Sequence, residues 1–576
     1  MTTKNISIPK KPSRKFLPDN LIIDAWDKLL PYYEDLKSRE LNSLKDLEKW
    51  LHDRSELEAV LEEDMAWRYI KMNIDTANKE LQESFEFFVT QISPNIAPYD
   101  DILNKKVNTC SFTSELTGDA YKIYLRGIRK SIELYREENI PIITQLQTDQ
   151  QKYGAVCAAM TVDIDGKTLT LQQAAKYFKE NDRTKREEVF NKVNKRRLED
   201  KNELNNQFNH LIKLRHKMAL NTGFKNYRDY KHEELGRFDY NIEDCFAFHD
   251  AIANEVMPII NRIDEERKKS LKLDSLKPWD TEVDISGKAP LKPFENGAEM
   301  LEKTIKAFYR LDSYFGECIE IMKEMGHLDL DSRIGKAPGG FNYPLYEIGV
   351  PFIYMNAAGT LRDLVTMVHE GGHAVHSFLS RDLELTEFKS VPSEVAELAS
   401  MGMELISMDF WDEFFSNEED LKRAKKEQLE KVIGTLPWVA AIDKFQHWIY
   451  ENPTHTDEER YQKWNEIINT FGSNIVDWTG YEEIRSNMWQ KQLHLYEVPF
   501  YYIEYGMAQL GAIALWRNYK RNPETTIAQY KEALKLGYTK SIGDIYKTAG
   551  IQFNFSREYV KELMLFINNE LNKLSN

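Results

Sequence analysis

Most of this chain consists of long segments in which apolar residues recur with the period of an α-helix, with charged residues between them. We expect helices in the segments that share this pattern: 24–90, 120–150, 171–235, 243–272, 295–325, 419–450 and 523–575. Only 26 Gly and 19 Pro occur among 576 residues, too few for the many turns of a β-rich chain. The pattern therefore predicts a mostly α fold, and the length predicts two or more packed subdomains.

Interruptions of the helical pattern are few. They are rich in Pro, Gly, Asn or Asp and fall at 273–297, 334–344 and 452–457. Strand-like patterning is confined mainly to Gly349–Met355 and to 160–170, which we expect to form a hairpin that turns at Asp165 and Gly166. We place a boundary near residue 190, which gives an N-terminal helical domain over 1–190 and a second domain over 191–576.

Charge and composition exclude several classes of function. The chain carries 77 basic and 93 acidic side chains, a net charge of -16, which repels nucleic acid. No stretch approaches eighteen apolar residues in a row, and the N-terminus lacks the apolar run of a secretion signal, so we expect a cytoplasmic protein without a membrane partner. The four cysteines have no CxxC spacing, which argues against disulfides and against a thiolate metal site.

The segment Thr360–Leu379 reads TLRDLVTMVHEGGHAVHSFL and predicts a helix, with Thr360 and Asp363 in the positions of a capping box. One apolar stripe would face the core: Leu361, Leu364, Val365, Val368, Gly372, Val375 and Leu379. His369 and His373 lie about 40° apart and one turn along the axis, the separation that lets two imidazoles reach one Zn²⁺. Glu370 points away from His369 by about 100°, toward a bound water rather than the metal.

Chance is the alternative explanation of this HExxH motif, and its register on an amphipathic helix favours the metal site. The longer HExxHxxGxxH variant is excluded, because positions 376 and 379 are His and Leu. We therefore expect His376 to be a core histidine. Gly372 falls on the packing stripe, whereas Gly371 has no evident packing reason and costs about 1 kcal/mol relative to Ala.

A third ligand must come from elsewhere, and the segment after Pro392, VPSEVAELASMGMELISM, supplies candidates. This helix is apolar on almost every face, so its carboxylates need a cation, a donor or a metal. Glu397 follows His373 by 24 residues, enough for a second helix to return, and is the best third ligand. Glu394 lies on the same side of this helix as Glu397 and is a candidate to orient a ligand imidazole. An internal salt bridge is the alternative for Glu394 and for Glu404.

These motifs resemble a known family. The runs PFIYMNAAGTLRDLVTMVHEGGHAVHSF, SEVAELASMGMEL and HLYEVPFYYIEYGMAQLGAIALW, with KPWD at Lys277–Asp280, are similar to the zinc oligopeptidases of the oligoendopeptidase F and thimet oligopeptidase type. The resemblance is closest to the oligoendopeptidase F branch and covers residues from about 100 onward. It implies a zincin-like fold, with two helical subdomains flanking a deep channel and a small sheet beside the HExxH helix.

The resemblance also implies roles for residues. One zinc ion per chain would be bound by His369, His373 and Glu397, and Glu370 would activate the zinc-bound water as general base. Residues 191–576 would form the catalytic domain. Relatives usually carry a bulky apolar residue where this chain has Gly371, which puts helix packing there in doubt.

A later segment holds further candidates for catalysis. The resemblance implies that a His and one or two Tyr near Pro499 stabilise the tetrahedral intermediate, which points to His494, Tyr505 and Tyr501. If Pro499 opens a helix, Tyr501 and Tyr505 share one face and Tyr502 turns away. The alternative is that these rings are core aromatics whose hydroxyls bond to backbone.

The function implied is endoproteolysis of short oligopeptides. The strand before the metal helix is a candidate edge strand for pairing with an extended peptide, and the glycine-rich loop 334–344 is a candidate lid. Two alternatives remain: a non-enzymatic scaffold with a vestigial HExxH, and an exopeptidase, for which no terminus-binding motif is evident. The oligomeric state is left open.

Overall fold

The structure is a computed structural model that describes residues 6–333, 335–337 and 339–575. Helices hold 70% of the residues and strands 4%, which confirms the mostly α prediction. The chain divides into two compact units, each built from three separate segments. Unit 1 comprises Met1–Tyr135, Lys292–Lys425 and Ala508–Phe553, and unit 2 comprises Arg136–Leu291, Lys426–Met507 and Asn554–Asn576.

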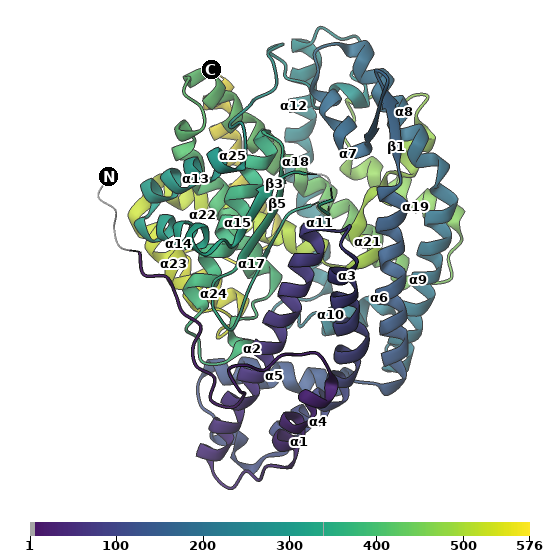
Figure 1. Cartoon of the computed structure of the whole chain (residues 1–576). Helices are drawn as coiled ribbons and strands as arrows, with labels where there is room; N and C mark the ends of the chain where they lie inside the picture. Colours follow the sequence, from purple (N-terminus) through teal and green to yellow (C-terminus); the bar gives the residue numbers. More distant parts are fainter. Residues whose placement is uncertain (1–5, 334, 338, 576) are drawn as a thin grey trace. The chain divides into compact units, whose positions relative to one another are not determined.

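Unit 1 contains the N-terminal helices and those of the predicted metal site (Figure 1). Its helices are α1 (Leu30–Ser38), α2 (Leu44–Ile74), α3 (Lys79–Phe87), α4 (Ser93–Thr109), α5 (Asp119–Leu134), α13 (Gly297–Leu311), α14 (Ser313–Met325), α15 (Leu361–Ser380), α16 (Thr386–Lys389), α17 (Ser393–Ile406), α23 (Pro523–Lys535) and α24 (Ile542–Thr548). Apolar packing of α1, α2, α4 and α5 gives this unit a core cluster that includes the fully buried Trp50.

Unit 2 is dominated by long helices, of which α6 and α9 run side by side (Figure 1). Its helices are α6 (Ile140–Ala158), α7 (Leu171–Ala174), α8 (Arg183–Glu199), α9 (Lys201–Asn221), α10 (Tyr227–Glu234), α11 (Ile242–Ala251), α12 (Met257–Ser270), α19 (Asp457–Phe471), α20 (Glu482–Ser486), α21 (Leu493–Glu497) and α25 (Arg557–Ser575). Two helices contain a unit boundary: α18 (Glu418–Glu451) and α22 (Tyr502–Arg521). Residue 190 lies inside α8, and the predicted division into domains 1–190 and 191–576 stays a prediction.

Strands are few and short, as expected. The hairpin forms from β1 (Thr161–Ile164) and β2 (Lys167–Thr170), and it turns at Asp165 and Gly166, both with positive φ. A second sheet has the order β3-β5-β4, from β3 (Leu328–Asp331), β4 (Phe341–Tyr343) and β5 (Phe352–Ala357). The strand predicted before the metal helix is β5, but β5 is central, paired in parallel to β3 and antiparallel to β4. The prediction of an edge strand there was therefore wrong, because the short terminal strand β4 covers that edge.

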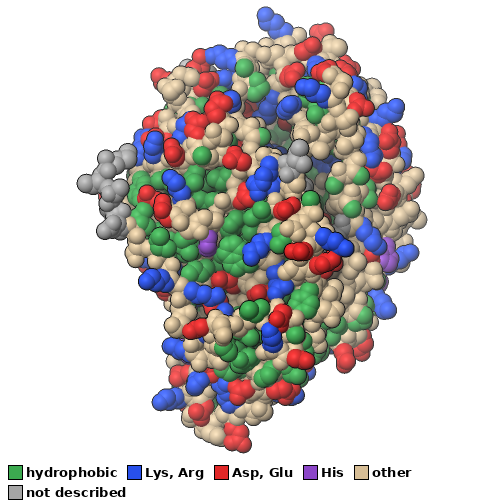
Figure 2. Space-filling model, viewed as in Figure 1, with side chains coloured by type: hydrophobic (Ala, Val, Ile, Leu, Met, Phe, Trp, Pro, Cys, Tyr) green, Lys and Arg blue, Asp and Glu red, His purple; other side chains and the backbone are tan. Residues whose placement is uncertain are grey.

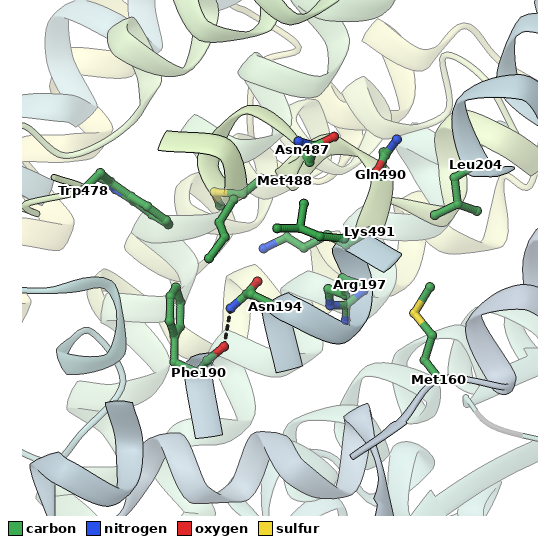
Figure 3. A pocket seen from close by; sticks show the side chains of 12 residues that line it. Met160, Phe190, Asn194, Arg197, Leu204, Trp478, Asn487, Met488, Gln490 and Lys491 are labelled. Carbon is green, nitrogen blue, oxygen red and sulfur yellow. Dashed lines mark hydrogen bonds between the residues drawn. The ribbon is translucent and has the colours of Figure 1, made fainter. Parts of the chain in front are cut away.

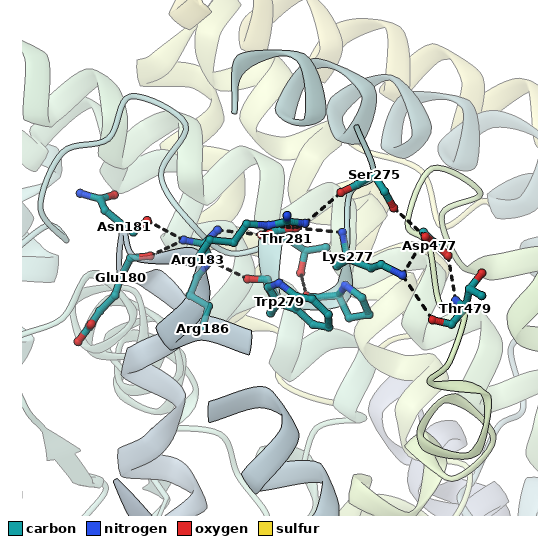
Figure 4. A network of polar contacts seen from close by, with 12 residues as sticks. Glu180, Asn181, Arg183, Arg186, Ser275, Lys277, Trp279, Thr281, Asp477 and Thr479 are labelled. Carbon is teal, nitrogen blue, oxygen red and sulfur yellow. Dashed lines mark hydrogen bonds and ion pairs between the residues drawn. The ribbon is translucent and has the colours of Figure 1, made fainter. Parts of the chain in front are cut away.

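The KPWD segment forms a buried polar junction within unit 2 (Figure 4). The carboxylate of Asp280, which has no exposed surface, accepts hydrogen bonds from the guanidinium groups of Arg183 and Arg186 at 2.8 Å. It also accepts one from the backbone N–H of Lys277 at 3.0 Å, which closes a single 3-10 turn, Pro278–Asp280. The segment is thus tied to the start of α8 by two charge pairs, of which the one between Asp280 and Arg186 is buried.

Replacing Asp280 with Asn should destabilise the protein by about 3–5 kcal/mol at pH 7, because Arg186 would keep its buried charge without a partner. Burial raises the pKa of Asp280, but the hydrogen bonds of Arg183 and Arg186 outweigh it and hold that pKa below its usual range. The carboxylate therefore stabilises the fold above its unfolded pKa of about 4, and this contribution is lost as the pH falls through the lower folded value.

Urea unfolding of the wild type and of Asp280→Asn at a series of pH values would measure this dependence. The difference in unfolding free energy between the wild type and Asp280→Asn should be largest at pH 7 and should decrease below about pH 4. Glu188→Gln, on the exposed face of α8, is the matched control and should change stability by less than about 1 kcal/mol. A difference that does not depend on pH would contradict the role of the charge.

The surface carries both signs of charge. On the face shown in Figure 2, Lys and Arg side chains are interspersed with Asp and Glu. Across the described residues, no helix combines the length and the apolar character required to span a bilayer.

Candidate metal centre

Helix α15 forms as its sequence predicts. Thr360 caps it, since its hydroxyl accepts from the N–H of Asp363 and the Asp363 carboxylate accepts from the N–H of Thr360 at 2.9 Å. Along the apolar stripe, Leu364, Val368 and Val375 have no exposed surface. The stripe fixes the rotation of the helix about its axis, and with it the direction of the HExxH side chains.

Helices α15 and α17 touch at a glycine. A Cβ on Gly372 would lie 2.5 Å from the carbonyl oxygen of Ala399 and 2.7 Å from Cα of Ser400, both backbone atoms of α17. No L-residue with a side chain fits without moving one helix, so Gly372 allows the two helices that carry the predicted metal ligands to approach this closely.

Gly372→Ala should destabilise unit 1 by about 1–3 kcal/mol or more, because the added methyl meets backbone that cannot swing away. Gly434→Ala is a matched control: Gly434 lies within α18 and a Cβ there has nothing within 4 Å. That substitution should instead stabilise the protein by up to about 1 kcal/mol, since alanine favours the helix. Chemical denaturation measures the unfolding free energy of both variants. Equal changes in that free energy would contradict the close approach at Gly372.

Gly371 has a packing reason that the sequence did not reveal. A Cβ there would lie 2.8 Å from the ring of Phe308, a residue of α13 that is fully buried. The ring of Phe308 occupies the space that a bulky residue at 371 would take. The doubt about packing at this position is therefore resolved in favour of a well-filled contact between α13 and α15.

Three predicted ligands come together at one point. Nε2 of His369 and Nε2 of His373 lie 3.4 and 3.8 Å from the same oxygen, Oε2 of Glu397. Single donor atoms of these three residues all lie within 4.8 Å of one another. Two imidazole nitrogens and a carboxylate oxygen are a donor set suited to Zn²⁺ with a fourth position left for water or substrate. His376, fully packed in the core, does not belong to this group.

A fourth side chain orients the first ligand. Oε1 of Glu404 lies 2.7 Å from Nδ1 of His369, so the imidazole donates its Nδ1–H to that carboxylate while its Nε2 faces Glu397. The sequence favoured Glu394 for this role and left a salt bridge open for Glu404, and the structure assigns the contact to Glu404. The spacing held the signal: Glu404 is seven residues after Glu397, two turns along the same face of α17.

Glu404→Gln should lower the affinity for metal by about 10–100-fold, because the amide cannot fix the imidazole tautomer as the carboxylate does. Competition with a chelator of known affinity, followed by metal analysis, measures the change. Glu384→Gln, at an exposed site in unit 1, serves as a control and should leave the affinity unchanged. Wild-type affinity in Glu404→Gln would show that the contact with His369 has no role in holding the metal.

Glu370 is buried on α15 beside the ligands. Burial raises the pKa of its carboxyl to about 7, with the charge of His369 and the backbone N–H of Asn342 acting in the opposite direction. Asn342 lies on β4, and its side-chain amide donates to the backbone oxygen of Glu370 at 3.3 Å, a contact that was not predicted. A carboxylate with a pKa near neutrality is suited to take up and release a proton.

The pKa of Glu397, the predicted carboxylate ligand, is shifted in the opposite direction from that of Glu370. Burial raises the pKa of Glu397, but its hydrogen bond with His369 and the nearby imidazole of His373 prevail and lower it to about 2. Ser400 donates its hydroxyl to Oε2 at 2.9 Å, which also favours the charged form. Glu397 is therefore ionised and Glu370 can be protonated, so the two neighbouring carboxyl groups are fitted to different roles.

The predicted His and Tyr residues form a cluster of their own in unit 2. His494 lies on α21. The centroid of its ring is 6.0 Å from the ring centroid of Tyr501, 4.8 Å from that of Tyr502 and 5.8 Å from that of Tyr505. Pro499 does not open a helix: α22 begins at Tyr502, and Tyr502 does not turn away from the cluster. Because these residues belong to unit 2 and the ligands to unit 1, their joint action stays a prediction.

The bend before this cluster depends on Phe500, a buried residue with a φ of 66°. Its N–H donates to Oε1 of Gln446 at 2.6 Å, and its carbonyl accepts from Arg237 at 2.5 Å. Both backbone groups are thus fixed by side chains of other segments of unit 2, which holds a conformation that costs an L-residue about 1–3 kcal/mol. The result is a defined start for α22 and a defined position for Tyr501.

A separate pocket of about 90 Å³ lies within unit 2, between α8 and the segment 478–491 (Figure 3). It is lined by apolar side chains together with Arg197, Lys491 and three amides, one of which, Asn194, donates to the backbone oxygen of Phe190. None of its lining residues is a His or a carboxylate, so it lacks the ligand types of the HExxH centre.

Known proteins match nearly the whole chain. Residues 177–565 match Peptidase family M3, and residues 23–135 match the Peptidase M3 N-terminal domain. The oligoendopeptidase F homolog of Borreliella burgdorferi is 23% identical over 554 residues, 90% of each chain. The plasmid oligoendopeptidase F of Lactococcus lactis subsp. cremoris is 24% identical over 322 residues, 55% of this chain and 52% of its own.

Solved structures share the fold. Pz peptidase A, solved with an inhibitor, has a TM-score of 0.89 at 25% identity and covers 95% of this chain and 97% of its own. An oligoendopeptidase-F from Enterococcus faecium has a TM-score of 0.62 at 17% identity over 96% of this chain and 93% of its own.

Proposed function

The chain belongs to peptidase family M3, a family of metallopeptidases, and from this premise we propose that it is a zinc endopeptidase that cleaves internal bonds of short oligopeptides. The observation that carries the proposal is the convergence of His369, His373 and Glu397 on one point, with Glu404 behind His369. The names of the matched relatives, oligoendopeptidases and oligopeptidases, support the substrate class.

His369, His373 and Glu397 would hold the zinc. The donor set fits, because Nε2 of each imidazole faces the shared oxygen of Glu397 and the tautomer of His369 is fixed by Glu404. Zinc in such a site supplies Lewis acid chemistry: it polarises the scissile carbonyl and acidifies water to a pKa of about 7.

Glu370 performs the proton transfers. In this proposal its carboxylate takes a proton from the attacking water and then delivers that proton to the nitrogen of the leaving amine. A group whose pKa lies at about 7 can do both near neutral pH. Burial of Glu370 also keeps bulk water from competing for the proton.

His494, Tyr501 and Tyr505 are proposed to stabilise the oxyanion of the tetrahedral intermediate, by an imidazole and phenol hydrogen bonds. The clustering of their rings supports the idea that they act as a group, and Tyr502 now joins the candidates. The peptide itself is proposed to pair with β4, the terminal strand of the sheet next to α15, through backbone hydrogen bonds.

The loop before β4 stays a candidate lid. Gly335 and Gly339 have positive φ and open space around them, whereas Ile334 and Pro338 lie outside the described residues. The deep channel, the cytoplasmic location and the absence of nucleic acid partners are likewise part of the proposal.

Metal analysis combined with product mapping tests the function. Purified protein should cleave internal bonds of a peptide blocked at both ends, and a chelator should stop the cleavage. Cleavage only of peptides with a free terminus would instead indicate an exopeptidase. Absence of cleavage from a mixed peptide pool by zinc-loaded protein would indicate a scaffold.

A further inference from the structure

A second cluster of metal-binding side chains lies in the core of unit 2, on helices other than the HExxH helix. Helix α11 carries Cys245 and His249 at i, i+4, and helix α18 carries Asp443 and His447 at the same spacing. Pairs at this spacing lie one above the other on a helix face. Metal sites within helical bundles are commonly built in this way, from facing helices whose donors project inward.

The distances are those of a compact site. Oδ2 of Asp443 lies 2.8 Å from Nε2 of His249 and 3.2 Å from Nε2 of His447. Donor atoms of Cys245, Asp443 and His447 all lie within 4.8 Å of one another. Ligand atoms around tetrahedral zinc lie about 3.3–3.8 Å apart, so small side-chain movements would bring the donors of Cys245, Asp443 and His447 into place. His249 lies outside that group of three and contacts it through Asp443, so its ring would have to turn toward the same point.

Burial makes this cluster unusual. The four residues are between 0% and 3% exposed, and Asp443 has no exposed surface at all. Among the described residues, only the two imidazoles come within 4 Å of its carboxylate as cationic partners, and its Oδ1 has no hydrogen-bond partner. Burying an ionised carboxylate in this way is costly unless a cation balances it.

We propose that Cys245, His249, Asp443 and His447 bind a divalent transition metal, zinc by the chemistry of the set. The thiol of Cys245 loses its proton to solvent, and each imidazole moves its proton from Nε2 to Nδ1, so that thiolate, carboxylate and two neutral imidazoles surround the ion. Two negative charges then balance Zn²⁺, and four protein ligands leave no open position. The site is therefore structural, and its existence does not depend on the proposed peptidase activity.

The missing CxxC spacing does not count against this site. Two donors one turn apart on each of two helices supply four ligands without any pair of neighbouring cysteines. The site would clamp α11 to α18 beside Gln446, the residue that fixes the N–H of Phe500. Loss of the metal should thus loosen the segment that precedes Tyr501.

Metal content distinguishes the two sites. Full-length protein purified under reducing conditions with added zinc should hold two ions per chain, and His369→Ala/His373→Ala should hold one. Adding Cys245→Ala to that double variant should remove the last ion, whereas adding Cys318→Ala, at another buried cysteine, should not. Absence of metal from His369→Ala/His373→Ala would overturn the proposal, whether or not the wild type is an active peptidase.

Cobalt gives a second, independent readout. Only the cluster in unit 2 contains a cysteine ligand, so Co²⁺ bound there should produce thiolate-to-cobalt charge-transfer absorption in the near ultraviolet. The band should appear when Co²⁺ replaces zinc in wild-type protein and in Cys318→Ala, and should be absent from Cys245→Ala. Should Cys245→Ala fail to fold, wild-type protein alone decides: absence of the band at saturating Co²⁺ would leave an Asp–His ion pair and refute the metal site.

Discussion

Replacing Glu370 with Gln should reduce kcat/KM for an internally cleaved peptide by about 10²–10⁴-fold while the protein keeps its zinc. The amide has nearly the same shape as the carboxylate but cannot accept a proton from water or return one to the leaving amine. Glu370 is not among the three residues whose donor atoms converge, so the metal should stay in place. A loss of turnover without a loss of zinc is the result that identifies Glu370 as the general base.

Two measurements on the same preparation check this prediction. Metal analysis should give the same zinc content as the wild type, and a quenched peptide should show the loss in kcat with little change in KM. Glu384→Gln controls for the change of Glu to Gln at an exposed position in the same unit and should be fully active. Retained turnover in Glu370→Gln would show that another group carries the proton.

The helical part of the fold could be read from the sequence because its signals are local. Long periodic segments, few breakers and a capping box at Thr360 each depend on residues within a few positions of one another. The hairpin at Asp165 and Gly166 was predicted for the same reason. Strands β3 and β4 were missed because each is short, no tight-turn signal joins them, and both pair with β5, which is distant in the sequence from β3.

At the metal centre, too, features set by neighbouring residues were predicted and features set by distant residues were not. His369 and His373 are paired by helix geometry alone, and the charge of Glu397 in an apolar helix made it conspicuous. Gly371 could not be explained, because its partner Phe308 comes from another helix. The start of α22 was misjudged for a similar reason: the positive φ of Phe500 depends on Gln446 and Arg237, and neither contact leaves a trace in the local sequence.

Glu397→Gln should remove the metal itself, with a loss of affinity greater than the 10–100-fold expected of Glu404→Gln. Oε2 of Glu397 is the oxygen that both imidazoles face, and its charge offsets part of the charge of the cation. The neutral amide is a poor ligand for zinc, so the variant should lose zinc to a chelator that leaves the wild type loaded. Peptidase activity should fall below detection and should return in part only at high zinc.

Glu394→Gln provides the matched control for this loss, since Glu394 is equally buried on α17 and lies one turn before Glu397. It should keep zinc under the conditions that strip Glu397→Gln. If Glu397→Gln kept its zinc and Glu394→Gln lost it, the third ligand would be Glu394. If both kept it, the two imidazoles would need a partner from outside α17. Loss confined to Glu397→Gln would establish that α17 supplies the carboxylate that completes the site built by α15, which explains why Gly372 must bring these two helices into contact.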